Sequence, residues 1–164
     1  MEKSELIKRA KEAIDAHKAR YYKDGEYVGA DFWDFAEIFE IIEDYYEVSG
    51  DKSVFKDFEE MYGFVLRSYT ADWAFNPFND DIMWLVIALT RAYIYTGEKK
   101  YLDTAISNFN ATYDRALSDD LGGGLFWRIE RQCKNTCVNC PAAVAAQFIA
   151  QATGDDSYYD KAKV

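Results

Sequence analysis

The stretch Asn76-Pro77-Phe78-Asn79-Asp80-Asp81-Ile82-Met83-Trp84 decides the fold. Asn79 is a favoured N-cap residue and Pro77 disfavours helix before it, so the pattern predicts a helix that begins at Asp80. The following run, from Ile82 to Leu89, has no polar face, which is typical of a helix that is buried on all sides. The N-terminus of this helix, with its two adjacent aspartates, is therefore the part expected to reach water.

The aspartate pair has two interpretations. Acidic residues in a first helical turn offset the helix dipole, each by about 0.3–1 kcal/mol, and this structural role is the ordinary one. A carboxylate that lies against apolar residues also costs free energy because it loses hydration. Proteins often retain such a carboxylate at a catalytic site, so this role is the second interpretation. The spacing alone leaves both interpretations open.

Composition narrows the class of protein and its partners. The 164 residues suffice for one domain that buries about two-thirds of its unfolded surface. Aromatic residues make up 17% of the chain, which suits a well-filled core and also a carbohydrate-binding cleft. The net charge is -10 and Lys and Arg form no cluster, so nucleic acid and anionic membranes are excluded as partners.

The sequence shows no targeting or membrane-spanning segment. Residues 1–6 lack the apolar stretch of a signal peptide, and the longest apolar run, from Ile82 to Leu89, is too short to cross a bilayer. We therefore expect a cytoplasmic protein if Met1 is the natural start, and an extracellular or periplasmic protein if a signal peptide was removed.

Hydrophobic periodicity predicts an all-α protein. The first, third and fifth helices have one apolar stripe, whereas the second, fourth and sixth are apolar on more than one side. The segment from Arg115 to Thr136 is predicted as a long functional loop, with room for a short β-hairpin near 122–130. The helices are expected at Lys3 to Tyr21, Ala30 to Val48, Val54 to Tyr69, Asp80 to the string Tyr95-Thr96-Gly97-Glu98, Tyr101 to Tyr113 and Pro141 to Ala152, with a seventh that begins at Ser157.

Similar strings end the second, fourth and sixth helices. Each contains a glycine, namely Gly50, Gly97 or Gly154, and an aromatic residue opens the next helix four or five residues later. The separation of about fifty residues suits helix pairs. One-striped helices that alternate with all-apolar helices predict an outer ring around an inner ring. We therefore predict a single domain over residues 1–164, an incomplete α/α toroid.

This topology gathers polar residues at one end of the ring. If consecutive helices are antiparallel, the second, fourth and sixth helices run parallel and begin at the same end. The residues expected there are Asp31, Trp33, Asn76, Asn79, Asp80, Asp81, Lys134, Asn135 and Asn139. Convergent acidic, amide and aromatic side chains in a concave site favour the catalytic interpretation of Asp80 and Asp81.

Four motifs follow one another along the chain. They are Asn79-Asp80-Asp81 with Trp84, the string from Ile94 to Ala105, Gly122-Gly123-Gly124-Leu125 with Trp127, and Lys134-Asn135-Thr136 with Asn139 before Pro141. In this order they resemble glycoside hydrolase family 76, the endo-α-1,6-mannanases. The resemblance implies an (α/α)6 toroid and retaining hydrolysis of α-1,6-linked mannan without a cofactor. It also implies that Asp80 is the nucleophile and Asp81 the general acid/base.

A retaining site also needs groups that hold the sugar. Such enzymes place two carboxyl groups about 5–5.5 Å apart beside the scissile bond. The candidates for stacking on mannose or hydrogen-bonding to it are Trp33, Trp73, Asn76, Asn79, Trp127 and Asn135. Each of these residues can equally belong to the core or cap a helix.

The chain is short for this family. Its helices make about half of a twelve-helix ring and resemble the N-terminal half. Half a ring exposes the apolar flanks of its inner helices, which soluble monomers rarely do. The alternatives are a fragment or truncated homologue, two copies that self-associate through the open flank, or flanks that are covered in another way.

The three cysteines suggest a rival interpretation. The spacing of Cys133, Cys137 and Cys140 resembles the iron–sulfur motif of radical S-adenosylmethionine enzymes, but the chain lacks their alternation of strands and helices. A zinc site would need a fourth ligand, and His17 is the only histidine. We therefore expect no metal, and interpret the cysteines as small apolar residues near the sixth helix.

Two other functions compete with hydrolysis. One is a catalytically inactive helical-repeat module that binds glycan or a protein partner. The other is a different enzyme on the same fold, such as an epimerase or an unsaturated-uronide hydrolase. These chemistries usually use a histidine base, and His17 lies at the border of an apolar stripe, where a packing role is favoured.

Overall fold

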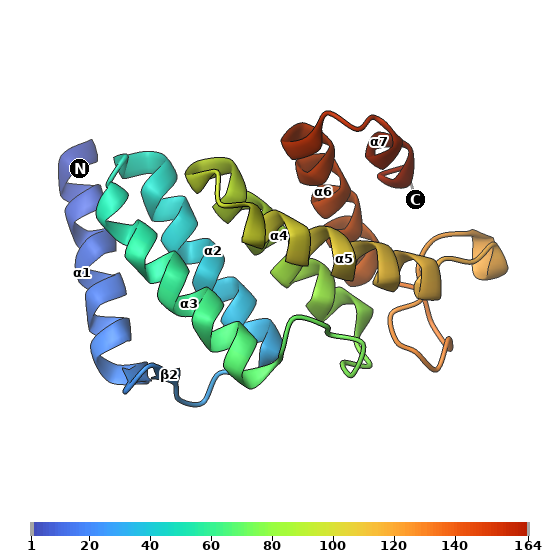
Figure 1. Ribbon diagram of the computed structural model, residues 1–164, viewed down its shortest axis with the longest axis horizontal. Helices are drawn as coiled ribbons and strands as arrows, with labels where there is room; N and C mark the ends of the chain where they lie inside the picture. Colours follow the sequence, from blue (N-terminus) through green and yellow to red (C-terminus); the bar gives the residue numbers. More distant parts are fainter. Residues whose placement is uncertain (1, 164) are drawn as a thin grey trace. The chain divides into compact units, whose positions relative to one another are not determined.

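The computed structural model describes residues 2–163, and these residues form helices, with a long loop between α5 and α6 (Figure 1). The chain divides into two compact units, unit 1 up to Tyr69 and unit 2 from Thr70. The all-α prediction is confirmed. Unit 1 contains α1 (Lys3–Tyr21), β1 (Tyr22–Lys23), β2 (Glu26–Tyr27), α2 (Phe32–Ser49), η1 (Lys52–Val54) and α3 (Phe55–Ser68). Unit 2 contains α4 (Asn79–Thr96), α5 (Lys99–Ala116), η2 (Asp120–Gly122), α6 (Thr136–Thr153) and α7 (Ser157–Lys161).

Aromatic rings form the core of unit 1. Phe35 of α2 packs on Phe64 of α3 with 4.7 Å between ring centroids, and Phe39 packs on Phe58 at 5.4 Å. Tyr27 of β2 meets the edge of Phe35 at 5.4 Å. Because α2 buries residues on more than one side, its predicted position between neighbours is confirmed within unit 1.

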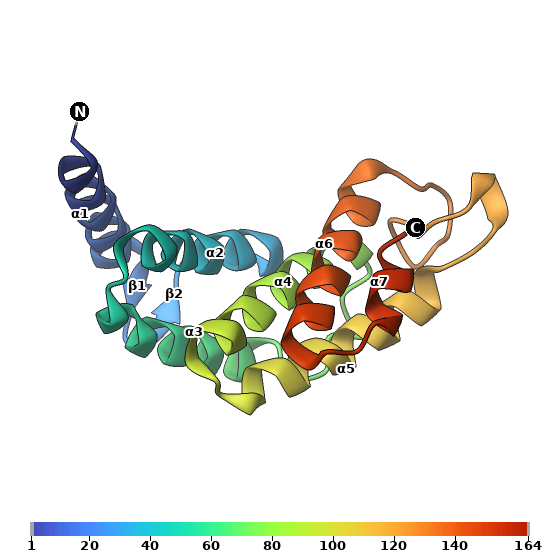
Figure 2. The ribbon, with the colours of Figure 1, turned by 90° about the horizontal axis from the view of Figure 1, so that it is seen from above.

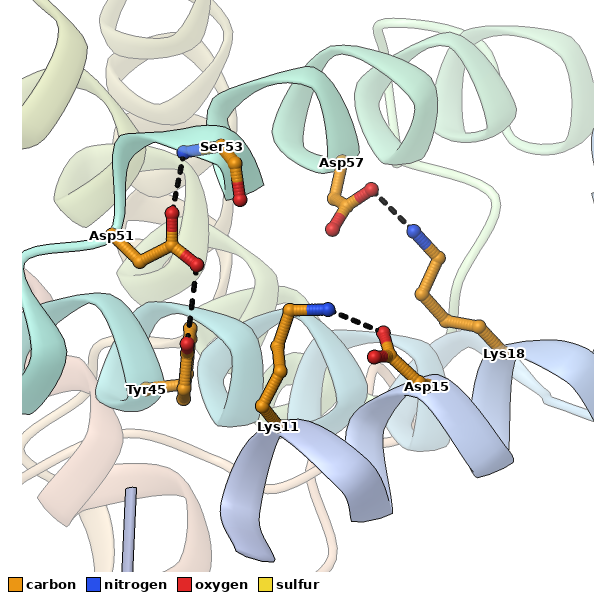
Figure 3. A network of polar contacts seen from close by, with 7 residues as sticks. All are labelled: Lys11, Asp15, Lys18, Tyr45, Asp51, Ser53 and Asp57. Carbon is orange, nitrogen blue, oxygen red and sulfur yellow. Dashed lines mark hydrogen bonds and ion pairs between the residues drawn. The ribbon is translucent and has the colours of Figure 1, made fainter. Parts of the chain in front are cut away.

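Polar contacts fix α1 against α3 at the edge of this core (Figure 3). Lys18 of α1 pairs with the buried carboxylate of Asp57 on α3. Nearby, Asp51 accepts hydrogen bonds from the hydroxyl of Tyr45 at 3.1 Å and from the backbone N–H of Ser53 at 2.9 Å. The carboxylate of Asp51 therefore stabilises the turn between α2 and α3 by accepting hydrogen bonds from both sides of it.

In unit 2 the central helix is α4, which is buried along almost its whole length, including every residue from Leu85 to Ala92. It ends at Gly97, whose φ of 76° is left-handed and suits glycine. The same conformation ends α2 and α6 at Gly50 and Gly154. The predicted repeat of glycine-capped apolar helices is thus confirmed.

Two helix boundaries differ from the prediction. Helix α4 begins at Asn79 rather than Asp80. The Asn79 side chain does not cap the helix, because it hydrogen-bonds to the carbonyl of Phe126 instead. Helix α6 begins at Thr136 rather than Pro141, because Asn135 is its N-cap and accepts from the N–H of Val138 at 3.2 Å. Pro141 lies within α6, where it removes a backbone donor without ending the helix.

The hairpin predicted near 122–130 is wrong in position. The two-stranded sheet of the described residues joins β1 to β2 instead. The 122–130 segment forms isolated bridges with three separate parts of the chain, pairing Leu125 with Leu117, Phe126 with Lys134 and Arg128 with Phe78. Since neighbouring residues have different partners, no second strand runs alongside.

Helix directions in unit 2 follow the prediction. Arg115, near the C-terminus of α5, hydrogen-bonds to Asn79 in the first turn of α4, so these two helices are antiparallel. The loop from Leu117 to Asn135 returns the chain to the start of α6 beside the start of α4 (Figure 2). Within residues 2–163, no helix is long and apolar enough to cross a membrane.

Candidate active site

One short segment, residues 125–127, joins the first turns of α4 and α6. On the α4 side, the backbone N–H of Asn79 donates to the carbonyl of Trp127, and its Nδ2 donates to the carbonyl of Phe126, both at 2.8 Å. On the α6 side, Oδ1 of Asn139 accepts from the N–H of Leu125 at 2.8 Å. The two helix N-termini are therefore held beside each other by one segment of backbone.

Arg115 closes this arrangement from α5. Its guanidinium donates to Oδ1 of Asn79 at 2.7 Å, to the carbonyl of Asn76 at 2.8 Å and to the carbonyl of Ala74 at 3.2 Å. Burial lowers the pKa of Arg115 from its ordinary value, as expected for a charge taken out of water. A single cation thus anchors the connection that leads into α4.

Asn76 in turn orients one of the aspartates. Its Nδ2 donates to Oδ2 of Asp81 at 3.1 Å, while its Oδ1 accepts from the N–H of Phe78 at 2.9 Å. Asn76 is buried and Asp81 is partly exposed. Asp81 is therefore a carboxylate at the surface whose direction is set by a buried amide.

The neighbouring Asp80 lies in a different environment. Its side chain is only 9% exposed, and its Oδ1 is buried without a hydrogen-bond partner among the described residues. A buried oxygen that is left unpaired is rare in folded proteins, and a catalytic role is one of its recognised explanations. The two adjacent carboxylates thus differ in exposure and in hydrogen-bond partners. Such a difference in environment allows two carboxyl groups of one site to have different chemical roles.

A small pocket opens in the loop between α5 and α6. It has a volume of about 220 Å³ and is lined by Trp127, Arg128, Glu130, Gln132 and Cys133. Arg128 lies over the ring of Phe78 at 4.4 Å and pairs with Glu130 at 3.0 Å. An aromatic face with neutralised polar side chains is suited to an uncharged polar ligand.

The structure brings together most of the predicted site residues of unit 2, with two corrections. Trp73 has no exposed surface and donates its indole N–H to the carbonyl of Thr70, so the expectation that it stacks on sugar is wrong. Asn79 is 1% exposed, and its side-chain amide already hydrogen-bonds to the carbonyl of Phe126 and to the guanidinium of Arg115. Its predicted contact with sugar is therefore also wrong. Asn135 caps α6.

Trp33 belongs to unit 1 and lies in the first turn of α2, which is capped by Asp31. Its side chain is 46% exposed, so it keeps an aromatic surface available to a ligand. Lys134, which the topology also placed at this end, donates to the carbonyls of Ser118 and Asp120 at 2.5 and 2.7 Å. Lys134 is therefore tied into the loop.

The cysteines are free and exposed at Cys133, Cys137 and Cys140, so their interpretation as apolar packing residues is wrong. Cys133 lies in the loop before α6, whereas Cys137 and Cys140 lie in the first turns of that helix because it begins earlier than predicted. Within the part of the chain that the structure describes, no group of three His, Cys, Asp or Glu side chains is arranged to hold a metal ion.

Sequence reasoning missed Arg115 and the electrostatic link between Cys137 and Asp80. Burial, the charge of Asp80 and a hydrogen bond to Asp80 raise the pKa of the Cys137 thiol. The signal for Arg115 was faint, since a single arginine at a helix end is ordinary. Both residues act through partners more than thirty residues away in the chain.

The chain is similar to known glycoside hydrolases in sequence and in structure. Residues 6–164 match glycosyl hydrolase family 76. The α-1,6-mannanase GH76A from Salegentibacter sp. HEL1_6 is 26% identical and superposes with a TM-score of 0.85, covering 96% of this chain and 48% of the mannanase. A family 76 mannosidase from Bacteroides thetaiotaomicron is 20% identical, with a TM-score of 0.72, and covers 97% and 52%.

Two further results qualify these matches. A D-mannose isomerase is 15% identical with a TM-score of 0.79, covering 98% of this chain and 52% of the isomerase, and shares the fold alone. No curated protein matches the sequence. The predicted fold class, helical hairpins of the α/α toroid type, is confirmed, and the chain spans about half the length of its structural relatives.

The close contact at Gly124 yields a prediction. A Cβ at this position would lie 2.6 Å from Oδ1 of Asn139, and its φ of +85° is left-handed. Gly123 has a similar φ of +97° but no atom within 4 Å. We expect Gly123→Ala to lower the free energy of unfolding by about 1 kcal/mol, from backbone strain alone, and Gly124→Ala by about 3 kcal/mol.

Urea unfolding of both variants and the parent protein measures this difference. Equal losses of stability in the two variants would contradict the role given to the contact between residues 125–127 and Asn139.

Proposed function

This chain belongs to glycosyl hydrolase family 76, and we propose that it acts on α-1,6-linked mannan by a retaining mechanism in which Asp80 and Asp81 are the two catalytic carboxyl groups. The observation that carries the proposal is the contrast between the two side chains. Asp80 is buried with an unpaired oxygen, and Asp81 is partly exposed and oriented by Asn76.

The structural relative supports the substrate class. A variant of the Salegentibacter mannanase in which two consecutive aspartates are replaced by asparagine is described as inactive, and its structure contains α-1,6-mannotriose. Adjacent aspartates also occur here as Asp80 and Asp81, in the first turn of α4. Because this chain spans about half of the relative, its own activity and substrate are parts of the proposal.

The proposed roles follow from the environments of the carboxylates. A carboxylate oxygen of Asp80 attacks the anomeric carbon, the bond from this carbon to the glycosidic oxygen breaks, and Asp81 gives its proton to the departing oxygen. In the second step Asp81 takes a proton from water, whose oxygen displaces Asp80 from the anomeric carbon. The partly exposed Asp81 is suited to exchange protons with solvent.

Recognition of the sugar is assigned to the pocket at residues 127–133. The indole Nε1 of Trp127 and Nε of Arg128 are buried without hydrogen-bond partners among the residues that the structure describes. Sugar hydroxyl groups are acceptors as well as donors, so a mannose unit that displaces the covering side chains would satisfy them. The pairing of Arg128 with Glu130 favours a neutral sugar over an anionic one.

The first test is hydrolysis of linear α-1,6-mannan by the purified chain, measured as new reducing ends. We expect release by the parent protein and a loss of at least about a thousandfold in Asp80→Asn, because the nucleophile is removed. Asp103→Asn, which changes an exposed aspartate on α5, serves as the matched control and should keep full activity.

Mannotriose binding, measured by calorimetry on the same samples, separates the competing functions. Binding without any release of reducing ends would overturn the catalytic proposal in favour of the glycan-binding module. Absence of both binding and release would contradict the mannan assignment as a whole.

We also propose that the chain self-associates through unit 1. A groove of about 450 Å³ lies between α1 and α2, and most of its lining is apolar. Ile41 and Val48 line it and are 56% and 54% exposed. Exposed apolar surface of this kind is typical of an interface. A second copy is the proposed occupant, because relatives of about twice this length share the fold.

Light scattering after size exclusion tests this second proposal. The parent protein should elute with the mass of two chains, and Ile41→Glu should elute as one chain because it places a charge in the groove. Leu121→Glu is the control, since Leu121 is 72% exposed and belongs to unit 2. A parent protein with the mass of a single chain would refute self-association.

A further inference from the structure

The segment 125–127 places a cysteine beside the candidate nucleophile. Asn79 and Asn139 bind this segment from the first turns of α4 and α6. Asp80 follows Asn79 in α4, and Cys137 precedes Asn139 in α6. The backbone arrangement therefore brings these two side chains to the same end of unit 2, independently of any property of the thiol.

The two side chains differ in their access to solvent. Asp80 is more than nine-tenths buried and its Oδ1 has no partner in residues 2–163, whereas Cys137 is exposed. A solvent-facing thiol and a buried carboxylate with one unpaired oxygen thus lie at the same end of unit 2. Such a carboxylate is stabilised by any donor that reaches it.

The thiol has one proton and two acceptors. Sγ of Cys137 lies 3.0 Å from Oδ1 of Asn135. That oxygen already accepts from the N–H of Val138 at 3.2 Å, so it is satisfied without the thiol. A hydrogen bond to an ionised carboxylate is stronger than one to an amide oxygen, which favours donation to Asp80.

We propose that Cys137 is a positioning residue of the active site, a neutral thiol that donates its S–H to the carboxylate of Asp80 and lines the surface where the sugar binds. The part of this proposal that concerns sugar rests on the proposed function. The part that concerns the contact with Asp80 does not.

The titration of the thiol is consistent with this geometry. Its pKa is raised by burial, by the charge of Asp80 on α4, by a hydrogen bond to Asp80 and, to a smaller extent, by Cys133 in the loop before α6. The backbone of Cys137 itself acts in the opposite direction. At neutral pH the thiol therefore keeps its proton and can serve as a donor.

The contact is tested without any substrate. Alkylation by iodoacetamide, followed by mass spectrometry at each cysteine over a range of pH, gives the midpoint for each thiol. In Asp80→Asn the midpoint of Cys137 should move to lower pH, because a negative charge is removed, while that of Cys140 should stay unchanged. An unchanged midpoint at Cys137 in a variant with native circular dichroism would overturn the contact.

The positioning role is tested by two substitutions at one site. Cys137→Ala should lower kcat on α-1,6-mannan about tenfold with little change in KM, because the donor to Asp80 is lost. Cys137→Ser keeps a donor and should restore kcat to within about threefold of the parent value. Cys140→Ser is the control and should behave as the parent. Equal activity in Cys137→Ala and Cys137→Ser would exclude donation as the cause.

Mannotriose distinguishes failure of this proposal from failure of the proposed function. If the sugar binds by calorimetry, it should slow alkylation of Cys137 at least about fivefold and leave Cys140 unaffected. Binding with no protection of Cys137 would overturn its place at the sugar surface while leaving the hydrolase assignment intact. Absence of binding would count against the proposed function, and the alkylation midpoints would still decide the contact with Asp80.

Discussion

The candidate site depends on two asparagine side chains that bind the backbone of residues 125–127. Asn79 donates to the carbonyl of Phe126, and Asn139 accepts from the N–H of Leu125. A loop that enters the interior must satisfy its backbone polar groups, and here the partners come from the first turns of α4 and α6. The same hydrogen bonds that satisfy the backbone of the loop therefore bring Asp80, Asp81 and Cys137 to the same end of unit 2.

Much of the fold could be predicted because its signals are local. Glycines in the left-handed conformation end α2, α4 and α6, and their sequence context is enough to identify them. The contrast between all-apolar and one-striped helices depends only on spacing along the chain. The parallel direction of α4 and α6 was expected because consecutive helices in a helix-pair repeat run antiparallel.

The predictions that failed concern residues whose partners lie far away in the sequence. Asn79 had the features of an N-cap, but its amide is taken by Phe126 and Arg115. Trp73 had the features of a sugar-stacking residue, but its backbone is held by Asn108 and its ring is buried. Residue type and spacing do not distinguish a local hydrogen bond from a tertiary one. The fold also does not decide the chemistry, since a D-mannose isomerase shares it. The two aspartates, and not the fold, therefore carry the proposed function.

A crystal structure of Asp80→Asn with α-1,6-mannotriose tests this account most directly. We predict a mannose unit at the N-terminal ends of α4 and α6, with Asp81 within hydrogen-bond distance of a glycosidic oxygen and Cys137 in contact with the sugar. The bonds from Asn79 and Asn139 to residues 125–127 should be unchanged. Mannotriose bound only away from these helix ends, with no contact to Asp81, would contradict the account.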